Sequence, residues 1–184
     1  RIIDARSFGV PQRRPRVVFL ASRIEHPKNI LFGEDHEYEA FDCSPAIIEH
    51  GTSYGFYWTE GSRGIGWAKE AVPPIKGGSS LGIPSPPAVW FSSDDFIGTP
   101  EIRDIERLQG FPIDWTLPAV NSSKRNTRWK LLGNAVNVAV SEWIGERFSS
   151  PQQMKKEPIL LNKVKVWPKA AFGENNNIYK TKII

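Results

Sequence analysis

Two arginines near the start of the chain, Arg14 and Arg16, are the first residues with an obvious chemical use. Side chains two positions apart project from the same face of a strand, so both guanidiniums would face one partner if a strand begins there. Each guanidinium stays charged and offers donors in a fixed geometry, which suits a phosphate or a base oxygen. The alternative is an exposed strand end whose arginines are only solvated.

Gly133 and Asn134 form a second candidate site, because an apolar periodicity typical of a helix follows them at Val136, Val140, Trp143, Ile144 and Phe148. Glycine lets a ligand approach the backbone closely, and the N-terminus of a helix favours a carboxylate. The pair therefore fits a contact with the acidic end of a ligand. An ordinary helix cap would use the same residues.

The single cysteine, Cys43, excludes an internal disulfide and is typical of a reducing compartment. His36, Cys43 and His50 are evenly spaced, but these gaps match no usual zinc-ligand spacing, so no metal site is expected. The sequence has no apolar run of membrane-spanning length and no signal peptide, which favours a cytoplasmic protein without a membrane partner. Because the first residue is Arg1, we expect a further segment upstream.

The positive charge lies mainly in the tail, where residues 155–184 hold seven lysines against two acids. The rest of the chain has 17 basic and 18 acidic residues, so overall basicity is weak support for DNA binding. Residues 1–23 hold six arginines and one acid, whereas residues 24–60 hold eight acids and one lysine. This asymmetry indicates one phosphate-facing side or, alternatively, a solvated charged surface.

The elements that must position these residues follow from hydropathy and turn residues. A buried strand is predicted at 17–21, and short strands joined by long loops are predicted at 25–98. Thr99 as N-cap and Pro100 at the first position predict a helix that ends at Gly110 and Pro112. A last helix is predicted to open directly after Asn134 and to close at Pro151.

Three segments resemble signatures of the DNA (cytosine-5)-methyltransferases, in that family's order. Residues 8–16, FGVPQRRPR, are similar to its eighth motif, Gly-Val-Pro-Gln-x-Arg-x-Arg. Residues 103–112, RDIERLQGFP, are similar to the ninth motif, and residues 128–136, RWKLLGNAV, to the tenth. The resemblance covers residues 1 to about 148, and it places target recognition in the stretch between the eighth and ninth motifs.

The resemblance implies a role for each matching residue. Arg16 would approach O2 of a cytosine rotated out of the duplex, Arg14 would contact a phosphate, and Gln12 would help to hold the loop. Gly133, Asn134 and Ala135 would contact the methionine end of S-adenosylmethionine. Candidate contacts to double-stranded DNA are Arg63, Lys69, Lys76, Gly77, Gly78 and Ser79. The aromatic residues Tyr57, Trp58 and Trp67 fit either loops pressed against DNA or an aromatic core.

The chain departs from the family in several places. Pro74-Ile75 stands where members often carry a Thr-Leu or Thr-Ile pair. Cys43 lies downstream of the eighth motif, whereas the family's nucleophile lies upstream in a Pro-Cys-Gln loop, so Cys43 is expected to be structural. The cofactor loop, that nucleophile and the Glu-Asn-Val acid are absent, and we therefore expect this chain alone to be inactive.

The sequence thus predicts an α/β fold: the edge of a doubly wound S-adenosylmethionine-dependent methyltransferase domain plus a loop-rich, mostly β target recognition domain. The predicted divisions are 1–24 (eighth motif), 25–98 (target recognition), 99–150 (ninth and tenth motifs) and 151–184 (a basic extension). The missing N-terminal catalytic half is the expected partner, in cis or as a separate subunit of a split enzyme, and the parent would fit a restriction–modification system. A DNA-binding module without methylation activity is the remaining alternative.

Overall fold

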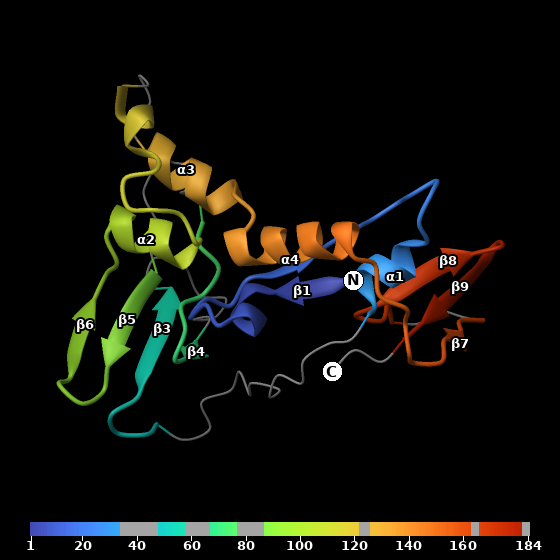
Figure 1. Ribbon diagram of the computed structural model, residues 1–184. Coiled ribbons are helices and arrows are strands. Elements are labelled where there is room, and N and C mark those ends of the chain that lie inside the picture. The colour runs from blue at the N-terminus through green and yellow to red at the C-terminus, as the bar shows by residue number, and fades with distance from the viewer. Residues whose placement is uncertain (34–47, 58–66, 77–86, 122–125, 163–165, 182–184) are drawn as a thin grey trace. The chain divides into compact units, whose positions relative to one another are not determined.

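The computed structural model describes residues 1–33, 48–57, 67–76, 87–121, 126–162 and 166–181 (Figure 1). These residues form a mixed α/β fold, as the sequence predicted at that coarse level. The chain divides into two compact units: unit 1 holds residues 1–3, 16–40 and 141–184, and unit 2 holds residues 4–15 and 41–140. This division groups the chain differently from the four predicted segments. Among the described residues, no helix has the length and apolar character needed to cross a membrane.

The first two strands, β1 (Ile2–Asp4) and β2 (Pro15–Val17), pair with each other and flank the short 3-10 helix η1 (Ala5–Phe8). The prediction of a buried strand at 17–21 is wrong, because β2 ends at Val17 and part of the run is exposed. Val17 and Phe19 are 76% and 88% exposed, while Val18 and Leu20 pack against the core of unit 1. Exposed and packed side chains therefore alternate along residues 17–20, and described residues cover only one of the two faces.

Unit 1 is built around a core of Ile30, Leu31, Phe32, Ala170 and Phe172. The first three residues come from α1 (Pro27–Leu31) and the position after it. Phe172 belongs to the C-terminal sheet and Ala170 directly precedes it. In this sheet β9 (Asn177–Lys180) lies between β7 (Ile159–Leu160) and β8 (Ala171–Glu174). The described residues of the lysine-rich tail thus contribute a three-stranded sheet to unit 1.

Unit 2 contains an antiparallel sheet of β3 (Ser53–Tyr57), β4 (Ala68–Lys69), β5 (Pro87–Phe91) and β6 (Phe96–Gly98), in the order β4-β3-β5-β6. This agrees with the short strands predicted for that stretch. On β3, Gly55 opposes Val89, and a Cβ at Gly55 would lie 2.2 Å from the carbonyl oxygen of Ala71. Only glycine lets the segment that follows β4 pack this closely against the sheet.

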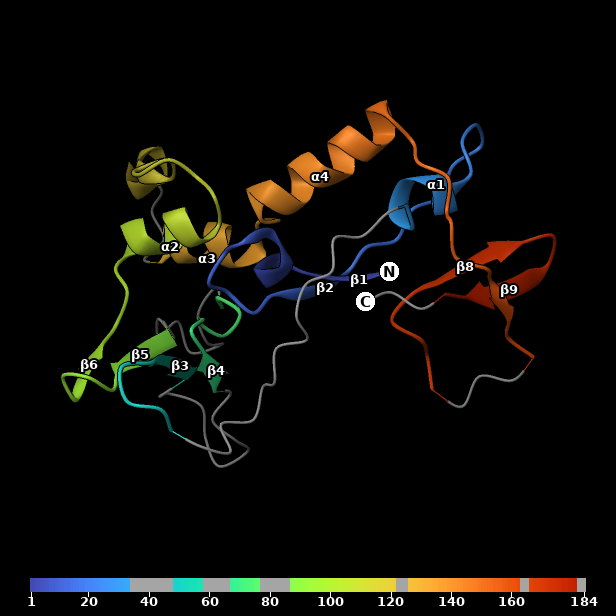
Figure 2. The same cartoon turned by 60° about the horizontal axis from the view of Figure 1, so that its bottom comes forward.

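The helices of unit 2 are α2 (Ile102–Leu108), the 3-10 helix η2 (Leu117–Asn121), α3 (Thr127–Asn134) and the start of α4 (Val138–Ser149). Both views show α2 beside α3 (Figures 1 and 2), and Ile75, Ile105 and Leu132 form the core between them. The predicted apolar face of α2 is confirmed, since Ile102 and Leu108 pack against that core.

Helix α2 begins at Ile102, two residues later than the start predicted from Thr99 as the N-cap. Glu101 is its N-cap, and the backbone N–H of Glu101 donates to the Asp104 carboxylate at 2.9 Å. Asp104, at the third position of the helix, thus satisfies the backbone N–H of the N-cap residue.

The end of α2 depends on Gly110, whose φ of +83° lies in the left-handed region. A Cβ at this position would also lie 2.9 Å from the Cβ of Val138. We therefore expect Gly110→Ala to lower the free energy of unfolding by about 1–3 kcal/mol, measured by urea denaturation. Gly145→Ala in α4 is the matched control, because a Cβ there meets nothing within 4 Å and alanine should stabilise the helix by about 0.5–1 kcal/mol. Equal effects of the two substitutions would contradict this account.

Candidate functional site

The loop from Asp4 to Arg14, which carries most of the first motif, is organised by one carboxylate. Asp4 Oδ1 accepts hydrogen bonds from the backbone N–H groups of Arg6 at 3.2 Å and Arg14 at 2.7 Å, and Oδ2 accepts from Nε of Arg13 at 2.9 Å. Gly9, with a φ of +78°, closes η1 within this loop. The sequence analysis missed Asp4, although an aspartate before a glycine-containing turn is a known signal of such side-chain to backbone bonding.

Arg14 joins this loop to the tenth motif. Its Nη2 donates to the carbonyl oxygens of Gly133 and Ala135, both at 2.7 Å, and Nη1 donates to that of Ile75 at 3.5 Å. Arg14 is 3% exposed, and all four residues belong to unit 2. In place of the DNA phosphate that the sequence analysis expected, the partners described for Arg14 are these backbone carbonyls.

Arg16 has a different environment, since it is an exposed residue of β2. The two arginines would share a strand face only if a strand began at Arg14, and this condition is not met. The strand begins only at Pro15, so Arg14 lies before it and Arg16 within it. The division between the units also falls here, with Arg14 in unit 2 and Arg16 in unit 1.

Gln12 contributes to the loop through its backbone. It forms a parallel bridge with Val72, in which Val72 N–H donates to the Pro11 carbonyl and Arg13 N–H donates to the Val72 carbonyl, both at 2.8 Å. The Gln12 side chain is fully buried, and its amide has no hydrogen-bond partner among the described residues. The loop is thus tied to the segment after β4 by main-chain bonds.

Gly133 and Asn134 end α3 rather than opening the last helix, which corrects the helix N-terminus predicted for them. Ala135 adopts an extended conformation, with φ −60° and ψ 147°, and it separates α3 from α4. The start of α4 is capped by Asn137, whose Oδ1 accepts from Ala139 N–H at 3.1 Å and whose Nδ2 donates to the Leu108 carbonyl at 3.0 Å. The Asn134 side chain is exposed at this turn.

Two of the predicted DNA contacts lie among the described residues, and both have partners within the protein. Lys69 Nζ lies 2.7 Å from the Glu49 carboxylate, whose hydrogen bond raises the pKa of Lys69. Lys76 Nζ lies 4.3 Å from the centre of the Tyr57 ring, a cation–π distance. The other predicted contacts, Arg63, Gly77, Gly78 and Ser79, lie outside the described residues, as do Trp58, His36 and Cys43.

The aromatic residues of this region pack on one another in unit 2. Trp67 stacks on Phe56 at 4.9 Å between ring centres and meets Tyr54 and Trp90 edge-on at 6.3 and 6.5 Å. Tyr54 is buried, and the Tyr57 hydroxyl donates to the Pro74 carbonyl. For these residues the aromatic core, one of the two alternatives for this segment, describes the observed packing. Ile75 also belongs to a buried core.

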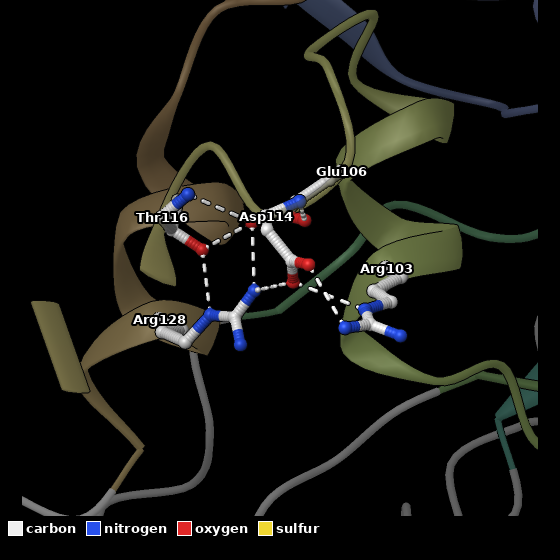
Figure 3. Close-up of polar contacts among 5 residues, drawn as sticks. All are labelled: Arg103, Glu106, Asp114, Thr116 and Arg128. Carbon is white, nitrogen blue, oxygen red and sulfur yellow. Dashed lines mark hydrogen bonds and ion pairs between the residues drawn. The ribbon is translucent and has the colours of Figure 1, made fainter. Parts of the chain in front are cut away.

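A buried ion-pair network, which sequence reasoning missed, holds the ninth and tenth motifs together (Figure 3). Glu106 on α2 is 0% exposed, and Nη2 of Arg128 on α3 lies 2.9 Å from its Oε1. The Glu106 carboxylate also accepts from Asp114 N–H at 2.6 Å and from both the N–H and the hydroxyl of Thr116, at 2.8 and 2.5 Å. At its edge, Arg103 lies 2.9 Å from the Asp114 carboxylate.

The network determines the protonation of its carboxylates. Burial alone would raise the pKa of Glu106, but the Thr116 hydrogen bonds, Arg128 and the Asp114 N–H together lower it to about 2. The hydrogen bond from Arg103 lowers the pKa of Asp114 as well. Both carboxylates are therefore charged at neutral pH, and the only sequence signal for this was the unusual acid at position 106 on the apolar side of α2.

Comparison with known proteins identifies a relative in sequence. The chain is 52% identical, over 186 aligned residues, to the "Type II methyltransferase M2.BsuMI" of Bacillus subtilis (strain 168), and the match covers 100% of this chain and 48% of that protein. The chain thus spans about half the length of the curated relative it matches. No protein-family model and no solved structure matches it. Over its entire length, the chain is therefore homologous to about half of a type II methyltransferase.

Proposed function

We propose that this chain is the DNA-recognition and active-site-completing part of a DNA (cytosine-5)-methyltransferase. The observation that carries the proposal is the Arg14 contact, which brings the eighth and tenth motifs together across 119 and 121 positions of sequence. Two segments with no local reason to meet are joined by a buried, charged side chain, as expected if their geometry serves one site. The homology to a type II methyltransferase supports the same proposal.

Arg16 is proposed to contact the target cytosine. It is exposed on β2, and its guanidinium can donate to the O2 atom of a base that has been rotated out of the duplex. Donation to O2 withdraws electron density from the ring and so favours attack on it. The nucleophile for that attack would come from the other half of the enzyme.

Asn134 is proposed to contact the methionine end of S-adenosylmethionine, which supplies an electrophilic methyl group when bound. The residues present fit this role because the Asn134 side chain is exposed while the carbonyls on either side of it are held by Arg14. A side-chain amide offers both donors and an acceptor, so it can pair with an ammonium or a carboxylate. Arg14 then acts as a positioning residue that keeps this turn in place.

The antiparallel sheet of unit 2 and its connecting segments are proposed to read the duplex sequence, with contacts from Arg63, Lys76 and residues 77–79. Lys69 is the weakest of the proposed contacts, because its ammonium is already paired with Glu49. The cofactor-binding half is the proposed protein partner, either in the same polypeptide or as a separate subunit.

The direct test combines this chain with the part of the Bacillus subtilis relative that lies outside the matched region. Tritiated S-adenosylmethionine and duplex DNA are added, and label in the DNA is counted. We expect transfer with both polypeptides present and none with this chain alone. If the 184-residue chain alone labels DNA, or if the complete enzyme of the relative binds duplex DNA without labelling it, the proposal is wrong.

Arg14→Met in the complete enzyme is expected to raise KM for S-adenosylmethionine by about tenfold or more, because a small displacement of a positioned group costs one to two orders of magnitude. The substitution removes the two hydrogen bonds at 2.7 Å that fix residues 133–135. Initial rates at varied cofactor and saturating DNA give the value.

Arg13→Met is the matched control for Arg14→Met, since Arg13 is a partly exposed neighbour whose described ion pair is with Asp4. It should leave KM for the cofactor close to that of the unmodified enzyme. A rise in the DNA Kd for Arg14→Met, with KM for the cofactor unchanged, would instead support the phosphate contact and contradict the positioning role.

A further inference from the structure

Large apolar side chains are exposed among the described residues of unit 2 from the end of α2 to the turn after α3. Trp115 is 60% exposed, and exposed apolar residues on the same segment are Ile113, Leu117, Val120, Leu131 and Val136. Scattered exposed apolar residues are ordinary, but a concentration of this kind on one short segment marks an interaction surface.

Two of these residues, Trp115 and Leu131, line one cavity of about 400 Å³. We call its exposed rim and walls the Trp115 face, which consists of Trp115, Pro118, Ala119, Leu131 and Ala135. Phe111 stacks on Trp115, with ring centres 5.9 Å apart and planes 9° from parallel. The face therefore offers a concave, aromatic-lined surface of the kind that receives apolar side chains of a partner protein.

The Trp115 face is held rigidly by the buried network of Figure 3. The N–H groups on both sides of Trp115, those of Asp114 and Thr116, donate to Glu106 at 2.6 and 2.8 Å. Arg128 binds the same carboxylate from α3, and its Nε donates to the Thr116 hydroxyl at 2.8 Å. The loop that carries Trp115 and the helix that carries Leu131 are thus fixed to one buried charge.

This arrangement calls for a functional reason, because burying a carboxylate is costly unless every lone pair finds a donor. Here the buried Glu106 carboxylate fixes the loop that carries Trp115, although the Trp115 side chain itself is exposed. A fixed loop loses less conformational entropy when a partner binds, so the arrangement favours docking.

We propose that the Trp115 face is the surface on which the cofactor-binding half of the methyltransferase docks. The inference rests on the proposed function, since Asn134 can complete a cofactor site only if the rest of that site lies against it. Ala135 belongs to the Trp115 face and directly follows Asn134, so a partner that reaches Asn134 covers this face. The matched relative extends well beyond the aligned part, which provides a segment of about this chain's size as the occupant.

The chemistry of the face favours protein over DNA as the occupant. DNA contacts are dominated by cationic groups on phosphates, whereas the members of the Trp115 face are all apolar. Arg128, the nearest cation of the network, is bound to Glu106 and Thr116.

The test measures association without cofactor or DNA. The full 184-residue chain is titrated by calorimetry with the part of the Bacillus subtilis relative that lies outside the match. Trp115→Ser and Leu131→Lys are each expected to weaken Kd at least about tenfold, as for aromatic and apolar centres of interfaces. Ile97→Ser on β6 is the matched control, since Ile97 is 59% exposed but lies on the sheet, and it should change Kd less than about twofold.

Several outcomes would overturn the proposal: no association of the unmodified chain, equal weakening by Ile97→Ser, or unchanged Kd for both variants of the face. Self-association of the chain that Trp115→Ser abolishes would assign the face to a second copy instead. Two face variants are used so that a folding defect in one, seen in its thermal midpoint, leaves the other to decide. If association depends on the Trp115 face but no methyl transfer follows, the docking inference stands and the proposed function fails. If methyl transfer occurs and Trp115→Ser leaves it intact, the proposed function stands and the docking inference fails.

Discussion

Replacing Arg16 with alanine in the complete methyltransferase is expected to lower kcat for methyl transfer roughly 100-fold, comparable to the loss of one preorganised donor at a reacting oxygen. The reason is that the Arg16 guanidinium is proposed to donate to the cytosine O2 atom, and this interaction strengthens as the ring becomes electron-rich during attack. Duplex binding rests on many backbone contacts, so the DNA Kd should change less than about threefold. Single-turnover transfer of tritium and a filter-binding Kd, measured on the same preparation, give the two values.

Arg23→Ala supplies the matched control for Arg16→Ala, because Arg23 is also an exposed arginine of unit 1 and lies outside the three motifs. It should leave kcat unchanged. If Arg16→Ala weakened DNA binding and methyl transfer by the same factor, Arg16 would be a phosphate contact and not a contact to the base.

The second large effect is expected on stability, at Arg128. Substituting methionine for Arg128 leaves Glu106 charged, fully buried and without its cation, so the free energy of unfolding at pH 7 should fall by about 3–5 kcal/mol. Urea denaturation measures the change. Arg103→Met is the control, because Arg103 forms a more exposed pair with Asp114 and its loss should destabilise the protein far less than the loss of Arg128.

Acid pH should reduce the effect of the Arg128 substitution. The pKa of Glu106 is lowered from 4.5 to about 2 in the folded protein, so the network's stabilisation is complete above pH 4.5 and is lost as the pH falls from 4.5 toward 2. The difference in stability between the unmodified chain and Arg128→Met should therefore narrow across that window. A difference that stays constant from pH 7 to pH 3 would show that Glu106 is not the group that Arg128 stabilises.

Local patterns in the sequence were sufficient to predict the short strands of unit 2 and the apolar face of α2. They failed where the start or end of an element depended on contacts with residues distant in the sequence. The periodicity from 136 to 148 correctly indicated a helix, but the preceding helix α3 and the break at Ala135 were missed. The break coincides with the position where Arg14 holds the carbonyls of Gly133 and Ala135, and no local pattern contains that information.

The fold of the C-terminal tail could have been predicted in part. Asn175 and Asn176 both have positive φ, at 50° and 61°, and they connect β8 to β9. Consecutive asparagines between short apolar segments are a recognised signal for this kind of hairpin turn. The sequence analysis interpreted this segment by its lysine charge. The hairpin is instead packed on the core of unit 1 by one buried aromatic residue, Phe172.

The candidate site shows the same distinction between residue type and environment. The sequence indicated that Arg14 and Arg16 matter, and it expected both guanidiniums to face a ligand, Arg14 a phosphate and Arg16 a base. Their burial separates them, because Arg14 satisfies backbone acceptors inside unit 2 while Arg16 is an exposed residue of β2. A guanidinium serves either purpose, so its role depends on which acceptors the fold places around it.

The central claim is that the parent enzyme methylates carbon 5 of cytosine, and nucleoside analysis tests it most directly. Duplex DNA treated with this chain, the cofactor-binding half and S-adenosylmethionine is digested to nucleosides, which are separated and identified by mass and retention time. The account predicts 5-methyldeoxycytidine as the methylated product and its loss with Arg16→Ala. Methylation on the exocyclic nitrogen of cytosine or adenine, with no 5-methyldeoxycytidine, would contradict it.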